Sequence, residues 1–444
     1  MDNARSAALA ALLHVDVDEG YSNIVLDKTL ASFSLNPRDK ALASTIFYGV
    51  LERRITLDYY ISQFSKMPIK KLAPQVLEIL RIGVYQILYL DRIPNSAAVN
   101  ESVNLAKENN FVKASGFINA ILRSVIRNIN SVKLPDPQKE RLQYLSVNYS
   151  CPKWIISLWQ QYYGPECTLG LLESLLNRPP VFAKVNNIVI SKENLIKRLE
   201  SEGVKATAIT WLENALSLEQ TGSISSLPSF LEGLFHIQDL SSQLCCYFLN
   251  PQPGQSVVDV CAAPGGKTFT LAEQMDNRGE LLSFDQYKGK VRLIQQGAQR
   301  LGLTIIKAGV RDASNPSDLL KPVDRVLCDV PCSGLGIIRR KPEIRYKLQS
   351  TIDSLPDLQY RILCESSRLV KGQGILVYST CTLNPRENNQ VADKFLENHP
   401  EFIQYPLVLP ETLTHAIQEP DNQLTLMPHL HGTDGFFIAA FQKR

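Results

Sequence analysis

The stretch SVVDVCAAPGGKTFTLAEQM at residues 256–275 decides the fold of the C-terminal half of the chain. A short apolar run leads into a turn with two glycines, and residues that favour helices follow the turn. Gly265 and Gly266 allow the backbone to turn sharply and to approach a ligand with amide groups free at the start of a helix. The stretch therefore predicts a strand, a turn and a helix. Because it has neither the GxGxxG nor the GxxxxGK[ST] spacing, the turn fits a nucleotide-binding loop and an ordinary strand-to-helix turn equally well.

Apolar runs alternate with helical segments from this stretch toward the C-terminus. The runs are SVVDV (256–260), ELLSFD (280–285), TIIKAG (304–309), RVLCDV (325–330) and GILVYST (374–380). Such alternation predicts a doubly wound sheet, which we assign to residues 236–444 as a Rossmann-like α/β domain. In a sheet of this kind the ligand site lies at the carboxyl ends of the strands.

The N-terminal half has a different pattern. Residues 1–135 repeat apolar side chains at three- and four-residue intervals, as in VLEILRIGVYQILYL at 76–90, and this periodicity predicts an all-α domain. A helical linker is expected over 136–176, with a break at Gly164 and Pro165.

The chain changes character again at residues 177–235. Short β-rich runs surround one amphipathic helix, SKENLIKRLESEG at 191–203, whose start Ser191 can cap. This pattern predicts a small α/β module of the RRM-like kind. The expected fold class is therefore multidomain, with an all-α N-terminal domain, a small α/β module and a C-terminal Rossmann-like α/β domain.

The composition limits the class of protein. The 444 residues carry a net charge of +3, which permits a nucleic-acid partner without requiring one. No apolar run is long enough to span a bilayer, and Asp16, Asp18 and Glu19 stand where a signal peptide would need its cleavage region. We therefore expect a cytoplasmic protein with no membrane partner. The nine cysteines form no CxxC pair, and His429 and His431 have no further ligand at metal spacing, so we expect neither structural disulfides nor a metal site.

Two aspartates end the strands that follow the glycine turn. Asp285 closes the second strand, where an acidic side chain can hold the two hydroxyls of a ribose. Asp312 follows the third strand and is placed to accept a hydrogen bond from an adenine amino group. Each aspartate alone fits a turn or a helix cap as well as a ligand contact. Together, after one glycine loop, they favour an adenosine-containing cofactor.

Two cysteines follow the last two strands. The fourth strand leads to Asp329 and Cys332 in DVPCSG (329–334), and the fifth leads to Cys381 in STCTLNPREN (379–388). If these strands are neighbours in the sheet, the two thiols lie near each other above the cofactor. For a cysteine such as Cys261, whose thiol has no such partner, packing is the preferred interpretation.

A pair of thiols suits methylation of cytosine at carbon 5. This carbon is a poor nucleophile until a thiolate adds to carbon 6 and breaks the aromaticity of the ring. Protonation or hydrogen bonding at the ring N3 assists, and Asp329 is the candidate for this contact. After methyl transfer the carbon-5 proton must leave and the thiolate must be expelled, a step that a second group can help.

These residues resemble the Nop/Sun-type family of RNA 5-methylcytosine methyltransferases. The resemblance rests on CAAPGGK, DVPCSG and STCTLNPREN, and QDLSSQL (238–244) and GTDGFF (432–437) are similar to flanking motifs of the family. It implies S-adenosyl-L-methionine as the cofactor, Cys381 as the covalent nucleophile and Cys332 as the residue that assists product release. The cofactor contacts that it implies are Cys261, Ala262, Ala263, Pro264, Gly265, Gly266, Lys267, Asp285, Asp312 and Asp329.

The N-terminal half is similar to a NusB-type RNA-binding domain. The similarity rests on NPRDKALASTIFYGVLERR (36–54) and IPNSAAVNESVNLAK (93–107). Such a domain occurs in a bacterial member of the family that methylates 16S ribosomal RNA. The resemblance therefore implies RNA, and specifically 16S ribosomal RNA, as the partner.

A basic segment follows Cys332. We expect the positive charges of IIRRKPEIRYK (337–347) to contact RNA phosphates beside the site, and these are Arg339, Arg340, Lys341, Arg345 and Lys347. Tyr346 is a candidate for stacking on a base. A charge run is also typical of a simple solvated face. Since the target cytosine must reach a thiol, an unpaired or flipped-out base is favoured.

Three other functions fit part of the pattern. An NAD-dependent oxidoreductase would use the glycine loop and Asp285 but would leave the two cysteines unexplained. A DNA cytosine methyltransferase would use Cys332 as the nucleophile and leave Cys381 idle. A non-catalytic RNA-binding assembly factor would fit the N-terminal half, but the presence of Cys381 favours an enzyme.

Overall fold

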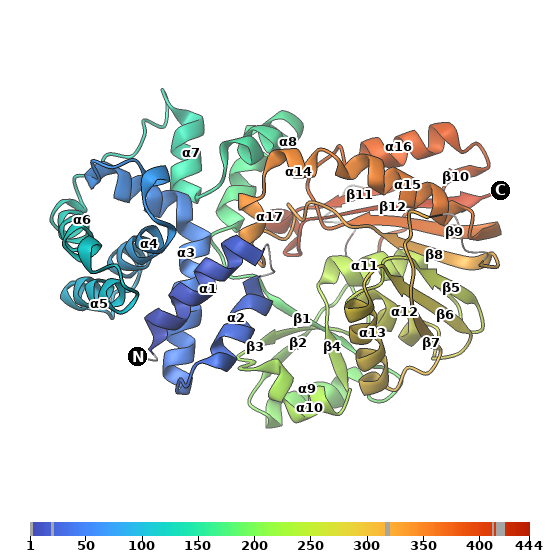
Figure 1. Cartoon of the computed structure of the whole chain (residues 1–444). Coiled ribbons are helices and arrows are strands. Elements are labelled where there is room, and N and C mark those ends of the chain that lie inside the picture. The colour runs from blue at the N-terminus through green and yellow to red at the C-terminus, as the bar shows by residue number, and fades with distance from the viewer. Residues whose placement is uncertain (1–2, 19–21, 316–319, 411–412, 414–421) are drawn as a thin grey trace. The chain divides into compact units, whose positions relative to one another are not determined.

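The computed structural model of the chain describes residues 3–18, 22–315, 320–410, 413 and 422–444. It divides into two compact units (Figure 1). One comprises residues 1–178 together with 338–347, and the other comprises 179–337 together with 348–444. No helix within the described ranges combines the length and the apolar character that a membrane crossing requires.

The first unit is helical, as the periodicity predicts. Its helices are α1 (Ala4–Asp18), α2 (Ser22–Ser32), α3 (Pro37–Phe64), α4 (Pro74–Tyr89), α5 (Asn95–Glu108), α6 (Ser115–Asn128), α7 (Arg141–Tyr149) and α8 (Lys153–Ser174), with short 3-10 turns η1 (Ile69–Lys71), η2 (Val112–Ala114) and η4 (Pro342–Tyr346). Asn36 caps α3 by accepting a hydrogen bond from the backbone N–H of Asp39, and Pro37 occupies the first turn. The predicted break in α8 is confirmed, because Gly164 has a φ of 78° there.

A segment distant in sequence completes this unit. Residues 338–347 contain η4 and pack with the helical unit. The Arg345 guanidinium is 1% exposed, and its Nη1 donates to the carbonyl oxygens of Glu52 and Ser150 at 3.0 and 2.9 Å. The Tyr346 hydroxyl donates to the carbonyl oxygen of Leu51 at 2.7 Å. The segment is therefore held by hydrogen bonds to backbone carbonyls of the helical unit.

The second unit begins with the small α/β module. Its elements are β1 (Val181–Val185), α9 (Lys192–Ser201), β2 (Lys205–Ala208), β3 (Ala215–Glu219), η3 (Ile224–Ser226), α10 (Pro228–Leu231) and β4 (Phe235–Ile237). Ser191 caps α9 as expected, since its side chain accepts from Asn194 N. The strands pair antiparallel in the order β2-β3-β1-β4, which is the ferredoxin-like arrangement.

The rest of the second unit is the Rossmann-like domain. Its strands are β5 (Ser256–Asp259), β6 (Glu280–Asp285), β7 (Ile306–Val310), β8 (Val323–Asp329), β9 (Val370–Thr380), β10 (Phe402–Gln404), β11 (Gln423–Leu426) and β12 (Phe436–Lys443). Its helices are α11 (Leu240–Leu249), α12 (Gly266–Gln274), α13 (Lys288–Leu301), α14 (Gln349–Ile352), α15 (Leu355–Ser367), α16 (Asn389–Asn398) and α17 (Pro428–His431). The strand order is β10-β12-β9-β8-β5-β6-β7, and β11 pairs with β12. The five strands expected from the sequence form the parallel part.

Helices cover both faces of this sheet, so it is doubly wound (Figure 1). Successive side chains of a strand point to opposite faces, and Val257 accordingly packs into one buried cluster and Val258 into the other. Helices α15 and α16 contribute to the cluster of Val258. The predicted fold class is therefore confirmed.

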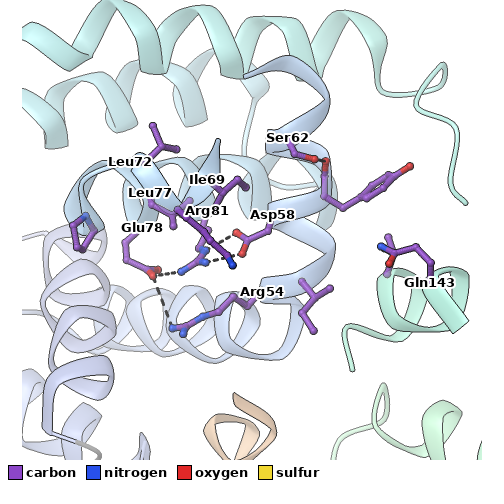
Figure 2. Close-up of a pocket in the computed structure, with 14 residues that line it drawn as sticks. Arg54, Asp58, Ser62, Ile69, Leu72, Leu77, Glu78, Arg81 and Gln143 are labelled. Carbon is purple, nitrogen blue, oxygen red and sulfur yellow. Dashed lines mark hydrogen bonds and ion pairs between the residues drawn. The ribbon is translucent and has the colours of Figure 1, made fainter. Parts of the chain in front are cut away.

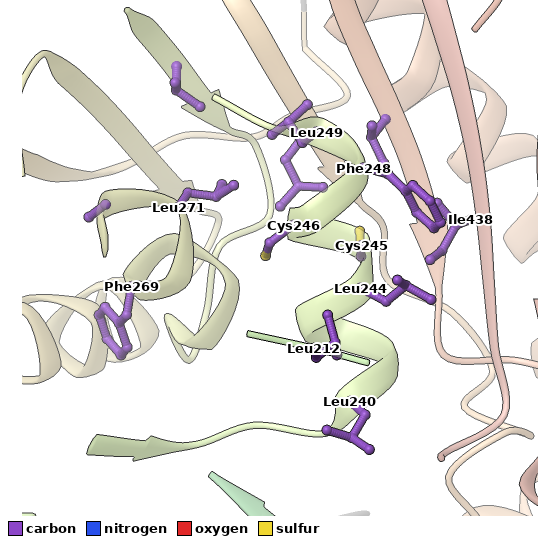
Figure 3. Packing of buried hydrophobic residues seen from close by; sticks show 14 of the residues in the cluster. Leu212, Leu240, Leu244, Cys245, Cys246, Phe248, Leu249, Phe269, Leu271 and Ile438 are labelled. Carbon is purple, nitrogen blue, oxygen red and sulfur yellow. The ribbon is translucent and has the colours of Figure 1, made fainter. Parts of the chain in front are cut away.

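Helix α11 fills the other cluster. It packs against α12, β9 and β12, and Figure 3 shows its side chains directed to both sides. Because both Cys245 and Cys246 are fully buried there, they act as small apolar residues, and burial raises the pKa of Cys245 to about 12. This core fixes the strands whose carboxyl ends carry the predicted site.

Candidate active site

The glycine loop connects β5 to α12. Gly265 precedes the helix with a φ of +114°, and a Cβ atom there would lie 2.3 Å from the ring of Phe269, so the position requires glycine. At Gly266 a Cβ would meet nothing closer than 3.8 Å, on the side chain of Gln238. Residues 261–267 thus lie between the end of β5 and the first turn of α12. Cys261 packs against the buried cluster of Val258, and burial raises the pKa of its thiol well above the usual value.

The two predicted aspartates lie along the same edge of the sheet, because β5, β6 and β7 are parallel neighbours. Asp285 is the last residue of β6, is 7% exposed, and accepts a hydrogen bond from Tyr287 N at 3.1 Å. Asp312 follows β7 and is exposed. Its Oδ1 accepts from the backbone N–H and the hydroxyl of Ser314 at 2.9 and 2.7 Å, and these bonds lower its pKa.

Asp329 ends β8 and is held on both carboxylate oxygens. Lys267 Nζ lies 2.7 Å from Oδ2, and the Ser379 hydroxyl donates to Oδ1 at 2.8 Å. Burial alone would lower the pKa of Lys267, but the charge of Asp329 and the hydrogen bond to it raise that pKa well above its usual value. The glycine loop and the fourth strand are therefore joined by an ion pair.

The two predicted cysteines meet. Strands β8 and β9 are parallel neighbours, with Asp329 paired to Ser379, and the loops that follow them bring Cys332 Sγ to 3.2 Å from Cys381 Sγ. The pKa of Cys332 is raised well above its usual value, first by its hydrogen bond to Cys381, then by burial and by the charges of Glu387 and Asp329. This arrangement favours the protonated form of the Cys332 thiol.

Backbone contacts behind Cys381 come from two glycines. Gly336 N–H donates to the Cys381 carbonyl at 3.0 Å, and Gly435 N–H donates to the Gly336 carbonyl at 2.9 Å. A Cβ at Gly336 would lie 1.9 Å from the Gly435 oxygen. The GTDGFF motif therefore supports the loop that follows β9, because only glycine allows the two backbones to approach this closely.

Sequence reasoning missed two buried acids at this site. Asp259, at the end of β5, accepts from the Thr268 hydroxyl at 2.8 Å, and burial raises its pKa to about 7. Glu387 is fully buried and accepts hydrogen bonds from residues of both cysteine loops. Both acids stand inside quoted stretches, Asp259 in SVVDV and Glu387 in STCTLNPREN. For Asp259, a carboxylate inside an apolar run was the available signal.

The side chains of the basic segment differ in how far they are buried. Arg345 and Tyr346 pack in the helical unit, and the Arg54 guanidinium lies 4.9 Å from the centre of the Tyr346 ring. The expectations that Arg345 contacts an RNA phosphate and that Tyr346 stacks on an RNA base are therefore wrong for this structure. Arg339 is 9% exposed, whereas Arg340 and Lys341 are partly exposed.

The described residues contain no group of three or more His, Cys, Asp and Glu side chains that could hold a metal ion. His431, one of the two C-terminal histidines, accepts a hydrogen bond from Met427 N through Nδ1 at 2.7 Å. This contact joins His431, the last residue of the short helix α17, to Met427, the residue before the helix.

The helical unit also contains a cavity of about 640 Å³ (Figure 2). Arg81 donates to both oxygens of Asp58 at 2.7 Å and to Glu78, and Arg54 lies 3.8 Å from Glu78. The charges of Asp58 and Glu78 outweigh the effect of burial and raise the pKa of Arg81. Because these charged side chains pair with one another, they form a structural ion-pair cluster in the cavity wall.

Comparisons with known proteins cover nearly the whole chain. The family model of the 16S rRNA methyltransferase RsmB/F matches residues 246–442, that of the NusB family matches 2–127, and that of a ferredoxin-like domain of RsmF/B-like methyltransferases matches 151–225. The chain is similar over its full length to probable ribosomal RNA small subunit methyltransferases B from Bacillus subtilis (36% identity, 99% of that protein) and from Synechocystis (37%, 100%).

Solved structures agree with this result. The crystal structure of PH0851 has 27% identity and a TM-score of 0.84, and the match covers 99% of each chain. A methyltransferase homolog from Pyrococcus horikoshii has 30% identity and a TM-score of 0.59, with 69% of this chain and all of that chain covered. With its fold, its site and its full-length similarity, the chain belongs to the family of ribosomal RNA small subunit methyltransferases B.

Proposed function

We propose that the protein transfers a methyl group from S-adenosyl-L-methionine to carbon 5 of a cytosine in 16S ribosomal RNA, with Cys381 as the covalent nucleophile. The observation that carries this proposal is the thiol pair at the ends of β8 and β9, with 3.2 Å between the two Sγ atoms. Two thiols beside an acidic residue match the needs of cytosine carbon-5 chemistry, whereas methylation of a more nucleophilic atom requires neither.

The residues at the carboxyl edge fit an adenosine-containing sulfonium cofactor. At Gly266, the first residue of α12, a Cβ would meet nothing closer than 3.8 Å, which leaves room for a ligand at this N-terminus, and the buried Asp285 carboxylate suits a pair of ribose hydroxyls. Asp312 is assigned to the adenine, and the remaining contacts are assigned to residues 261–267 and Asp329. When bound, this cofactor supplies an electrophilic methyl group.

The chain's own residues act on the base. The Cys381 thiolate attacks carbon 6 of cytosine and forms a carbon–sulfur bond, so that electron density moves to N3 and carbon 5 becomes nucleophilic. Asp329 faces this ring edge, and the proton-bearing group of its ion pair is the Lys267 ammonium, which lies 2.7 Å from Asp329 Oδ2. The ion pair also fixes the orientation of the carboxylate.

Release reverses the addition. A base removes the carbon-5 proton, and the electrons of the carbon–sulfur bond return to Cys381. Cys332 assists because its protonated thiol donates a hydrogen bond to the departing sulfur, in line with its raised pKa.

RNA is the partner that family membership implies. We assign recognition to the NusB-like helical unit and to Arg339, Arg340 and Lys341, whose segment begins six residues after Cys332. The cytosine must leave its stack to reach a thiol, so an unpaired or flipped-out base is the proposed substrate.

Bisulfite sequencing tests the proposal directly. A strain that lacks the protein should lose 5-methylcytosine at one position of 16S ribosomal RNA, and the wild-type gene should restore it. The gene with Cys381→Ala should not restore it. An unchanged methylation pattern in the deletion strain would refute the proposed substrate, and restoration by the Cys381→Ala gene would refute the proposed nucleophile.

A further inference from the structure

Glu387 joins the two loops that carry the thiols. It lies in the loop between β9 and α16 and is fully buried. Its Oε2 accepts from Ser333 N at 2.8 Å and from Gln359 Nε2 at 2.9 Å. Its Oε1 accepts from the Ser333 hydroxyl at 2.6 Å and from Asn384 Nδ2 at 2.9 Å. One carboxylate thus bonds the residue next to Cys332 and a residue of the loop that follows Cys381.

The surrounding contacts keep these loops in register. Gln359 Nε2 also donates to the carbonyl of Pro331 at 3.0 Å, so both neighbours of Cys332 are tied to the same carboxylate–amide pair. The hydroxyls of Ser333 and Thr382 lie 2.7 Å apart, which adds a second link between the residues that follow the two cysteines. The Tyr378 hydroxyl fixes the backbone of Glu387 by donating to its carbonyl at 2.6 Å.

Only a carboxylate fits this position. Four donors converge on two oxygens, and a carboxylate accepts all four without presenting a donor of its own. An amide of the same shape would turn its NH2 group toward donors that already point at it, and a buried donor without an acceptor is destabilising. The negative charge has a further effect, because it contributes to the raised pKa of the Cys332 thiol.

We propose that Glu387 is a positioning residue that clamps the loop of Cys332 to the loop of Cys381 and holds the Cys332 thiol beside the nucleophile. The inference rests on the proposed function, since it assigns Glu387 to the thiol pair of that reaction. Glu387 has no contact with substrate in this role and acts through Ser333 and Gln359.

Turnover and its pH dependence test the clamp. Glu387→Gln should lower kcat for 16S ribosomal RNA methylation by about tenfold or more, while Kd for S-adenosyl-L-methionine stays within about twofold. Loss of the negative charge should lower the pKa of Cys332, so the alkaline limb of the kcat profile should move to lower pH. Ser333→Ala, which keeps the backbone bond to Glu387, should lower kcat in the same direction but by less. A wild-type kcat in Glu387→Gln would overturn the inference.

Asp324→Asn is the matched control. Asp324 also accepts several hydrogen bonds, from Ser256 N and Oγ and from Lys371 Nζ, but it lies at the opposite end of the sheet, where β8 begins. This variant should destabilise the domain without moving the alkaline limb. If Glu387→Gln loses activity but its kcat–pH profile keeps the alkaline limb in place, as that of Asp324→Asn should, the role of Glu387 is merely structural and the inference is wrong.

A measurement without turnover separates this inference from the proposed function. In a Cys381→Ala background, where the hydrogen bond between the thiols is absent, the pH dependence of Cys332 alkylation by iodoacetamide can be followed by mass spectrometry. Adding Glu387→Gln should lower the alkylation midpoint by about half a pH unit or more. An unchanged midpoint would remove Glu387 from the control of Cys332, whereas absence of 5-methylcytosine with the wild-type enzyme would count against the proposed function alone.

Discussion

Cys332 Sγ lies 3.2 Å from Cys381 Sγ, within hydrogen-bonding distance and well beyond the disulfide bond length of about 2.05 Å. The two thiols come from different loops, and each loop follows one of two neighbouring parallel strands. A pair at this distance allows one sulfur to act as a thiolate while the other acts as a hydrogen-bond donor. The proposed mechanism therefore gives the two cysteines separable tasks.

Replacement of Cys332 tests this separation. If Cys332 acts only in release, Cys332→Ala still permits attack by Cys381 and methyl transfer, so a protein–RNA adduct should accumulate and survive denaturing electrophoresis. The double variant Cys332→Ala with Cys381→Ala should show no adduct, because no carbon–sulfur bond can form. Accumulation of adduct in Cys381→Ala instead would mean that Cys332 is the nucleophile.

Asp285 should control cofactor affinity. Asp285→Ala removes a buried carboxylate from the end of β6, and loss of charged hydrogen bonds to a ribose should weaken S-adenosyl-L-methionine binding by about 10- to 100-fold. Isothermal titration calorimetry measures this change. Cys381→Ala is the control and should bind the cofactor like the wild type, since the nucleophile acts on the base. Unchanged affinity in Asp285→Ala would remove this residue from the cofactor site.

Arg339 and Arg340 should contribute to RNA affinity. Phosphate contacts release counterions, so Arg339→Ala with Arg340→Ala should weaken RNA binding and reduce the slope of log K against log salt by about 1 to 2. Filter binding or fluorescence anisotropy at several salt concentrations gives this slope. The same slope in wild type and variant would assign the two arginines to the structure of the segment and not to RNA.

Arg345, in the same segment, should behave differently. Its guanidinium is buried and donates to two backbone carbonyls, so Arg345→Met should lower the free energy of unfolding by about 1–3 kcal/mol by leaving these carbonyls unsatisfied. Chemical denaturation measures the loss, and the salt dependence of RNA binding should not change. A reduced salt slope in this variant would show that the guanidinium reaches phosphate, contrary to its position here.

Asp324 should make stability depend on pH in the acid range. Burial alone would raise its pKa, but hydrogen bonds from Ser256 and Lys371 lower it from 3.8 to about 2. A carboxyl group whose pKa is depressed by folding stabilises the native state above its unfolded pKa, and this contribution is lost as the pH falls through the folded value. Asp324→Asn should therefore remove about 1–2 kcal/mol of the change in unfolding free energy between about pH 4 and about pH 2, with allowance for partial exposure.

Lys371→Met provides the check on this assignment. It removes one of the three hydrogen-bond donors of Asp324. It should therefore reduce the pH dependence of the unfolding free energy, but by less than Asp324→Asn does. Denaturant titrations at several pH values give both results. Equal acid dependence in wild type and Asp324→Asn would contradict the assignment.

The amino-acid sequence by itself determined the elements and their order. The alternation of apolar runs with helical segments predicted the five parallel strands β5 to β9, and the two glycines predicted the turn before α12, because periodicity and backbone freedom are local properties. Ser191 and Gly164 likewise indicated a helix start and a helix break correctly. The motifs also placed both cysteines directly after strands. Their thiols could therefore be expected to lie close together only if those two strands were neighbours in the sheet.

Tertiary structure alone decided which of these residues meet. Strand order depends on long-range packing, so the sequence left open that β8 and β9 are neighbours and that Cys332 contacts Cys381. It also gave no sign that Glu387 collects four hydrogen bonds, since three of the donors come from Ser333 and Gln359, far along the chain. The basic segment could not be interpreted from sequence for the same reason. A run of charged residues does not reveal which side chains are exposed and which are buried, and only the structure shows that Arg345 is buried.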